Sequence, residues 1–136
     1  MEPFVVESID EPGVYWSTFE DDGRVAYLYL GTEKGIVADV WLYNRRPAPD
    51  RSEFRDKKNL PFLNPREFIS REVVDPVVRE EDLEFEWLRG PGEGEVTLLL
   101  KIRGVLWGKL IPGARPGWSR LAVKDGPLAN VLHLNR

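Results

Sequence analysis

The chain of 136 residues contains no cysteine, one methionine and one histidine. Without cysteine it has no disulfide, thiol nucleophile or thiolate metal ligand, which is typical of proteins from a reducing compartment. The single histidine, His133, excludes zinc sites built from several histidines, and its place near the chain end argues against a Ser-His-Asp triad. The sequence therefore favours a non-enzymatic protein with no catalytic residues, no metal and no cofactor, although it leaves enzymatic activity open.

Long apolar runs and an excess of positive charge are also missing. No apolar run approaches the roughly 20 residues of a membrane-spanning helix, and the N-terminal MEPFVVESID lacks the features of a signal peptide. With 19 basic and 23 acidic residues, the net charge of −4 opposes general nucleic-acid binding, which needs a concentrated positive surface. We predict a cytoplasmic protein with neither a membrane nor a nucleic-acid partner.

What is present indicates one folded domain over residues 1–136. The chain is 42% hydrophobic and 31% charged, and it contains five Trp, four Tyr and six Phe. Apolar residues recur with a period of two in two regions, which is the pattern of β-strands. A first meander is therefore expected over residues 12–44 and a second over residues 82–111, separated by a crossing segment, 45–81, and followed by a tail, 112–136.

In the first meander, Asp22-Gly23 is the dipeptide that best supplies a tight type I′ hairpin turn, and a second turn is expected at Glu33-Lys34. These turns divide the side chains between two faces. The face predicted as core carries Val14, Trp16, Thr18, Val25, Tyr27, Tyr29, Ile36, Ala38, Val40 and Leu42. The opposite face is also largely apolar, so the rest of the chain or a partner must cover it; it carries Tyr15, Ser17, Phe19, Ala26, Leu28, Leu30, Val37, Asp39, Trp41 and Tyr43.

The second meander begins with DLEFEWL, which places Leu83, Phe85 and Trp87 on one face. Its loop RGPGEG leads into EVTLLLKI; closing the loop from Leu88 to Glu95 sets Leu83 opposite Leu100, and the faces of the two strands agree across the hairpin. The following VLWGKLI is expected to add Val105 and Trp107 to the core face. Residues 66–79 suit a short helix or a strand, and the tail suggests a short helix from about Pro127, capped by Asp125. The predicted fold class is accordingly α+β and predominantly antiparallel: two three-stranded meanders around one core, with one or two short helices.

The first meander resembles a family of small uncharacterised bacterial β-rich proteins. Its members share the Phe-Glu-Asp-Asp-Gly turn, the Tyr-x-Tyr strand and the strand ending in an apolar-Tyr-Asn segment, which stand here as FEDDGRVAYLYL and IVADVWLYN. The likeness covers residues 17–44 well and residues 83–110 loosely. It implies a bacterial, cytosolic, β-rich protein and assigns no chemistry.

Asp39 is the first candidate for a site, because it interrupts an apolar strand and a carboxylate inside a sheet face must be solvated, paired or used. In the expected register Tyr15, Trp41 and Tyr43 lie near it. These four residues suggest an aromatic pocket with one acid, which would take a ligand or a partner. The alternative is an Asp39 that is paired with an arginine under the crossing segment.

The charged candidates form two patches. Arg45, Arg46, Arg51 and Arg55 in the crossing segment suit an anionic partner, and the acidic face of Asp82, Glu84 and Glu86 suits a basic one. Ordinary solvated surface is the favoured interpretation of each patch, and a binding role is the alternative. The acidic run Glu20-Asp21-Asp22 is interpreted as a hairpin turn, with a metal or partner contact as the alternative.

We therefore expect a non-enzymatic protein-binding module with a protein partner, of the kind represented by a bacterial immunity protein that inhibits a basic toxin. One alternative is a small-ligand binder or enzyme that uses the Asp39, Trp41 and Tyr43 face. Another is a structural homo-oligomer, such as a homodimer, that covers the second apolar face of the first meander.

Overall fold

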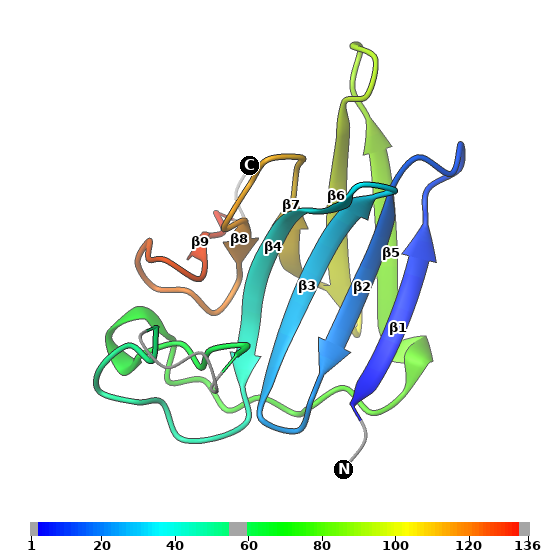
Figure 1. The fold of residues 1–136 in the computed structure, drawn as a ribbon. Coiled ribbons are helices and arrows are strands. Elements are labelled where there is room, and N and C mark those ends of the chain that lie inside the picture. Colours follow the sequence, from blue (N-terminus) through cyan, green and yellow to red (C-terminus); the bar gives the residue numbers. More distant parts are fainter. Residues whose placement is uncertain (1–2, 55–59, 134–136) are drawn as a thin grey trace.

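The computed structural model describes residues 3–54 and 60–133, which form two β-sheets that pack against each other (Figure 1). The first sheet is four-stranded, in the order β1-β2-β3-β4, and the second is five-stranded, in the order β5-β6-β7-β8-β9. The strands of the first sheet are β1 (Phe4–Ile9), β2 (Trp16–Asp21), β3 (Val25–Thr32) and β4 (Gly35–Asn44). Those of the second are β5 (Leu83–Arg89), β6 (Val96–Ile102), β7 (Val105–Leu110), β8 (Trp118–Ser119) and β9 (Asn130–Val131).

The hairpin between β2 and β3 is shifted by two residues from the predicted register. Asp21 lies opposite Ala26 and Thr18 opposite Tyr29, so Gly23 and Arg24 form the tip of the turn. Gly23 has a φ of +88°, a backbone conformation that glycine adopts at low cost. A shift of two residues preserves the two faces of the hairpin, because side chains alternate with a period of two.

Two irregularities in β4 decide which of its side chains face the core. The turn at Glu33-Lys34 is as predicted, since Thr32 lies opposite Gly35. The register then shifts by one between Leu30 and Gly31, and again between Ala26 and Tyr27. A shift of one turns every following side chain to the other face until the second shift reverses it.

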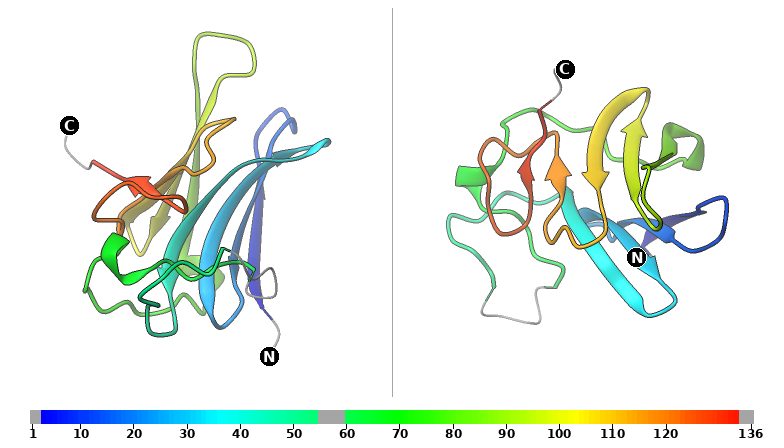
Figure 2. Two further views of the ribbon diagram at one scale, coloured as in Figure 1. Left: turned by 60° about the vertical axis from the view of Figure 1, so that its left-hand side comes forward. Right: turned by 90° about the horizontal axis from the view of Figure 1, so that it is seen from above.

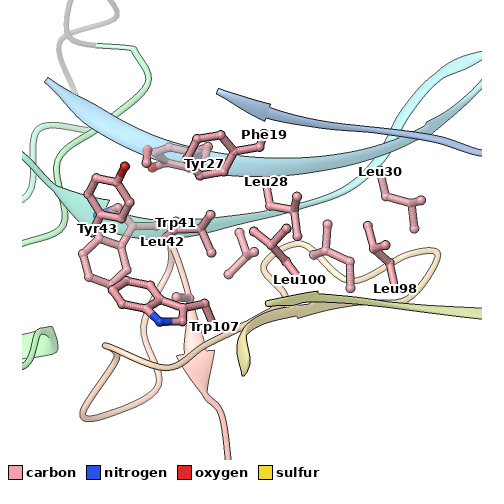
Figure 3. Close-up of a cluster of buried hydrophobic side chains, with 14 of the residues drawn as sticks. Phe19, Tyr27, Leu28, Leu30, Trp41, Leu42, Tyr43, Leu98, Leu100 and Trp107 are labelled. Carbon is pink, nitrogen blue, oxygen red and sulfur yellow. The ribbon is translucent and has the colours of Figure 1, made fainter. Parts of the chain in front are cut away.

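The core lies between the two sheets and is one cluster (Figure 3). The first sheet contributes Phe19, Leu28 and Leu30, each with 0% exposure. The second sheet contributes Leu98 and Leu100, also 0% exposed. Through Phe19, Leu28 and Leu30, the first sheet thus packs by the face that was predicted to need a cover, and the second sheet is that cover. On β2 and β3 the predicted core residues Trp16, Thr18, Tyr27 and Tyr29 lie instead on the outer face. On β4 the register shift turns the predicted core residues Ala38 and Val40 inward, where they are buried as predicted.

The second sheet extends its meander with β8 and β9, which pair in parallel. The register of β5 with β6 differs by two residues from the prediction, with Leu83 opposite Ile102, so Leu83, Phe85 and Trp87 share the predicted inward face. Val105 was predicted to join the core as well, but it is 43% exposed.

The predicted α+β class is wrong, because the chain is almost entirely β. Among the described residues the helical elements are two three-residue 3-10 turns, η2 (Arg66–Phe68) and η3 (Glu80–Asp82). The tail forms β9 instead of the helix expected from Pro127, and the Asp125 carboxylate accepts a hydrogen bond from the Val131 amide at 2.8 Å. The segments that were expected to be helical form backbone hydrogen bonds with other parts of the chain instead, for example from the Ser70 amide to the Leu121 carbonyl. Such bonds stabilise extended backbone, whereas an isolated short helix is only marginally stable. Within the described ranges no helix has the length and apolar character needed to cross a membrane.

The segments before and after β8 close the free edge of β4. The Gly113 amide donates to the Val37 carbonyl at 2.9 Å, and the Asp39 amide donates to the Ala114 carbonyl at 3.1 Å. The Trp41 amide then donates to the Leu128 carbonyl at 3.0 Å. β4 therefore has backbone partners on both sides, whereas β1 and β5 are edge strands that lie on the same side of the molecule (Figure 2).

Candidate functional site

The two shifts in β4 separate the residues that were predicted to form an aromatic pocket. Asp39 lies opposite Tyr29 and Trp41 opposite Tyr27, so both side chains belong to the outer face of the first sheet. Tyr43 lies beyond the second shift and is packed in the core. Its ring contacts the Trp107 ring edge-on, with 6.0 Å between the ring centroids. The shared face on which the small-ligand alternative depended is therefore absent from the observed register.

Asp39 is paired, as the alternative interpretation of this residue expected. Its carboxylate accepts hydrogen bonds from Arg115 at 3.2 and 3.3 Å. The partner comes from the segment after β7 and not from the crossing segment. Because the Arg115 side chain is 55% exposed, the pair is a surface interaction of small energetic value.

Tyr43 belongs to a buried hydrogen-bond network at the end of β2. Its hydroxyl donates to Asp21 Oδ2 at 2.7 Å and accepts from the Val77 amide at 3.1 Å. Burial, with a further contribution from Asp21, raises the pKa of Tyr43 well above its ordinary value. The network links the crossing segment to the first sheet. Its carboxylate, that of Asp21, is buried, because Asp21 is 2% exposed.

Tyr15 also has a structural partner. Its side chain is 8% exposed, and its hydroxyl donates to the Gly94 carbonyl at 2.8 Å. This contact joins the start of the first meander to the hairpin between β5 and β6.

The three acids at the turn point in three directions. Glu20 lies on the outer face of the sheet, Asp21 is in the core, and Asp22 Oδ1 accepts from the amides of Arg24 and Val25 at 2.8 and 2.9 Å. Within the described part of the chain, no group of three His, Cys, Asp or Glu side chains is arranged to hold a metal ion.

The predicted basic patch is divided. Arg45 contacts Asp21 at 3.4 Å, while Arg46 and Arg51 are exposed. Arg55 lies outside the described residues.

The predicted acidic face is partly neutralised. Asp82 pairs with Arg79 and Arg103 at 3.6 and 3.5 Å, and Glu86 contacts Lys101 at 3.4 Å. Glu84 is exposed on β5.

The outer face of the first sheet presents three parallel rows of side chains, each running across all four strands. The pairings define an apolar row of Ile9, Trp16, Gly31 and Ile36, a middle row of Glu7, Thr18, Tyr29 and Asp39, and a third row of Val5, Glu20, Tyr27 and Trp41. The crossing segment covers one end of the third row, where the Tyr27 hydroxyl donates to the Phe62 carbonyl at 2.8 Å. We call the remainder the open face; it comprises the apolar and middle rows together with Val5 and Glu20.

The open face is apolar at one end and acidic beside it. Ile9 is 68% exposed and Ile36 is 42% exposed, and a hollow of about 600 Å³ that adjoins Ile9, Val14 and Trp16 lies at this end of the sheet. Glu7 and Glu20 take part in no ion pair among the described residues. Burial, followed by the nearby Asp22 carboxylate, raises the pKa of Glu20, so the fold makes its negative charge less favourable than in water.

β1 is the strand of the first sheet that the sequence interpretation missed. Its sequence FVVESI is rich in β-branched residues, which was the available signal. Without β1, three exposed members of the open face (Val5, Glu7 and Ile9) remained unassigned.

Comparison of the chain with family models, curated proteins and solved structures finds no match. The resemblance of the first meander to small bacterial β-rich proteins thus stays a prediction, and the function has to be argued from the geometry.

Proposed function

We propose that this chain is a non-enzymatic, cytoplasmic protein-binding module that meets a basic protein partner through the open face. The partner class fits the role of an immunity-type inhibitor, in which a small acidic protein neutralises a basic toxin. The main observation behind this proposal is that the apolar row lies beside two carboxylates, Glu7 and Glu20, which have no basic partner among the described residues. Interfaces are typically built from an apolar, aromatic centre and a polar rim, and this face offers both.

Three exposed apolar side chains support the proposal because they lie together on one sheet face. Val5, Ile9 and Ile36 are 45%, 68% and 42% exposed and lie on the same face as the half-buried Trp16 and Tyr29. Contiguous apolar surface of this kind is a common mark of protein interaction sites, and Trp and Tyr are frequent hot-spot residues.

The charge of the face selects a basic partner. Glu20 is partly desolvated next to Asp22 and would be stabilised in its charged form by a lysine or arginine from outside. The neighbouring Tyr29 ring adds an aromatic surface over which such a cation is attracted. A second copy of this chain would bring acid to acid, so a homo-oligomer through the open face is disfavoured.

The test is capture of partners with matched surface variants. The immobilised chain is exposed to lysate of its source cell, and the retained proteins are identified for the wild type, for Ile9→Ser combined with Glu20→Lys, and for a control with Val73→Ser and Glu93→Lys. Val73 is 91% exposed and Glu93 is exposed in the β5–β6 loop, so the control replaces a β-branched apolar residue by serine and a glutamate by lysine away from the open face.

We expect one basic protein that is retained by the wild type and the control but lost with the open-face variant. Co-expression with the wild-type chain should then relieve the growth defect that this protein causes. If every retained protein is bound equally by all three, or if the chain instead runs at twice its 15.6 kDa mass and loses this on Ile9→Ser, the proposal is rejected.

A further inference from the structure

The outer edge of β1 carries backbone hydrogen-bonding groups that the described residues leave unused. The Asp10 amide donates to the Tyr15 carbonyl at 3.0 Å, which identifies this pair as hydrogen-bonded across β1 and β2. Such pairs alternate along an antiparallel ladder. The amides and carbonyls of Val5, Glu7 and Ile9 therefore point away from β2, in the plane of the sheet and beyond its β1 edge.

The fold treats the two edges of the first sheet differently. The β4 edge receives backbone bonds from the segment after β7 and from Leu128, as described above. β1 receives none on its outer side from the described residues. Natural sheets usually protect an edge strand with proline, lysine or a bulge, and the six residues FVVESI of β1 contain no proline or lysine and pair with β2 without a register shift.

A hollow of about 520 Å³ lies beside this edge, between β1 and β5. Val6, Leu83 and Phe85 supply apolar walls. Glu80 and Glu81 supply carboxylates, and both are exposed without an ion pair among the described residues. Apolar walls with acidic groups at the mouth suit the aliphatic stem and charged head of lysine or arginine.

Contacts between the two edge strands hold the hollow open in a fixed form. The Trp87 indole donates to Ser8 Oγ at 2.9 Å, and the Arg89 guanidinium pairs with the buried Asp10 carboxylate. Ser8 lines the hollow, and Asp10 follows directly after β1. Little reorganisation is needed for a ligand to enter, which lowers the cost of binding.

We propose that an extended, basic segment of the partner protein adds to the free edge of β1 as a further strand of the first sheet, with one lysine or arginine side chain in the hollow at Glu80 and Glu81. This inference rests on the proposed function and specifies how the partner is held. Strand addition supplies affinity through the main chain and specificity through alternate side chains. The carboxylates of Glu7, Glu80 and Glu81 favour a basic segment over a second copy of this acidic chain.

The probe is a fluorescein-labelled heptapeptide of alternating lysine and valine, whose binding to the full chain is followed by fluorescence anisotropy. Two further peptides carry N-methyl groups on all lysine or on all valine amides. An extended peptide directs these two sets of amides to opposite edges. We expect binding by the unmethylated peptide and by only one of the methylated peptides, because only the edge facing β1 must donate hydrogen bonds.

The contribution of the hollow is measured with Glu80→Gln combined with Glu81→Gln. The control is Glu11→Gln combined with Glu93→Gln, which changes the net charge equally at exposed positions in other loops. We expect the first pair to weaken peptide binding about three- to tenfold and the control to change it less than twofold. Circular dichroism of all variants confirms that the sheets are retained.

Three results overturn the inference: no binding of the unmethylated peptide, equal binding of both methylated peptides, or equal weakening by the two pairs of variants. If one of these occurs while the basic partner is still captured through the open face, the proposed function stands and only the strand-addition mode is rejected. Failure of both experiments rejects the two proposals together.

Discussion

Gly31→Ala should destabilise the protein through a single contact, that of Gly31 with the Trp16 indole. A Cβ at Gly31 would lie 2.1 Å from the nearest carbon of the Trp16 ring, which is far inside van der Waals contact. The two residues face each other on β2 and β3, and the indole Nε1 donates to the Thr32 carbonyl at 2.9 Å. Since the ring cannot share this space with a methyl group, the indole must leave the surface of the sheet.

The magnitude follows from what the indole loses. A fully buried Trp covers 150–250 Å², so a half-buried Trp16 loses roughly 100 Å², or about 2.5 kcal/mol. The lost hydrogen bond adds about 1 kcal/mol. We expect Gly31→Ala to lower the free energy of unfolding by about 2–4 kcal/mol and the melting temperature by roughly 10 °C.

The assay is a double-mutant cycle in urea with Gly31→Ala, Trp16→Ala and the combined variant. When Trp16 is already alanine, the added methyl group meets no ring, and Gly31→Ala should change the free energy of unfolding by less than about 0.5 kcal/mol or stabilise slightly. The expected coupling energy is at least about 2 kcal/mol. Equal destabilisation in both backgrounds would show that the cost arises in the β3 backbone and would refute the reasoning.

Three further predictions concern the polar residues of the first sheet. Tyr43→Phe should lower the free energy of unfolding in urea by about 1–3 kcal/mol, because it removes the donor to Asp21 and the acceptor for Val77; a smaller loss than for an exposed tyrosine would contradict the network. Asp39→Asn should change the same free energy by less than about 1 kcal/mol, since its arginine partner is exposed, and a larger loss would show a role that the surface pair does not explain. Burial raises the pKa of Tyr27, Tyr29 and Tyr43, so the folded state favours the neutral phenols. Their contribution to the free energy of unfolding should be complete below pH ~10 and fall as the pH rises further. We expect tyrosine ionisation, followed by ultraviolet absorbance, to coincide with loss of the β-sheet signal in circular dichroism. Ionisation of all tyrosines before unfolding would disagree with this burial.

The sequence was sufficient to predict the strands of both meanders and the faces of the β2–β3 and β5–β6 hairpins. The predicted faces of those hairpins are correct despite an error of two residues in register, because side chains alternate with a period of two. For the β3–β4 pair the turn was predicted correctly, but the faces of residues 38–41 relative to those of β3 were not. Two one-residue shifts interrupt the pairing along β4, a strand that packs against the second sheet and forms bonds to residues 113–128, and neither shift is encoded in local alternation.

This difference in register explains why the predicted site was only partly present. Asp39 and Trp41 both lie on the outer face, whereas Tyr43 lies in the core, because a register shift separates Trp41 from Tyr43. The open face was hidden for another reason. Its exposed edge comes from β1, whose inward residues Val6 and Ser8 were not recognised as one side of a strand.

Closure of the β4 edge by residues 113–128 has a consequence for the order of folding. The β-hairpins join neighbouring segments and can form early, while the bond from Asp39 to Ala114 joins residues 75 positions apart and closes a long loop. During synthesis, the ten-residue β4 strand is complete long before the segment that caps it leaves the ribosome. Throughout that interval the unpaired backbone groups of its edge are available to neighbouring nascent chains, so chaperone dependence should be greatest between the emergence of Asn44 and that of Leu128.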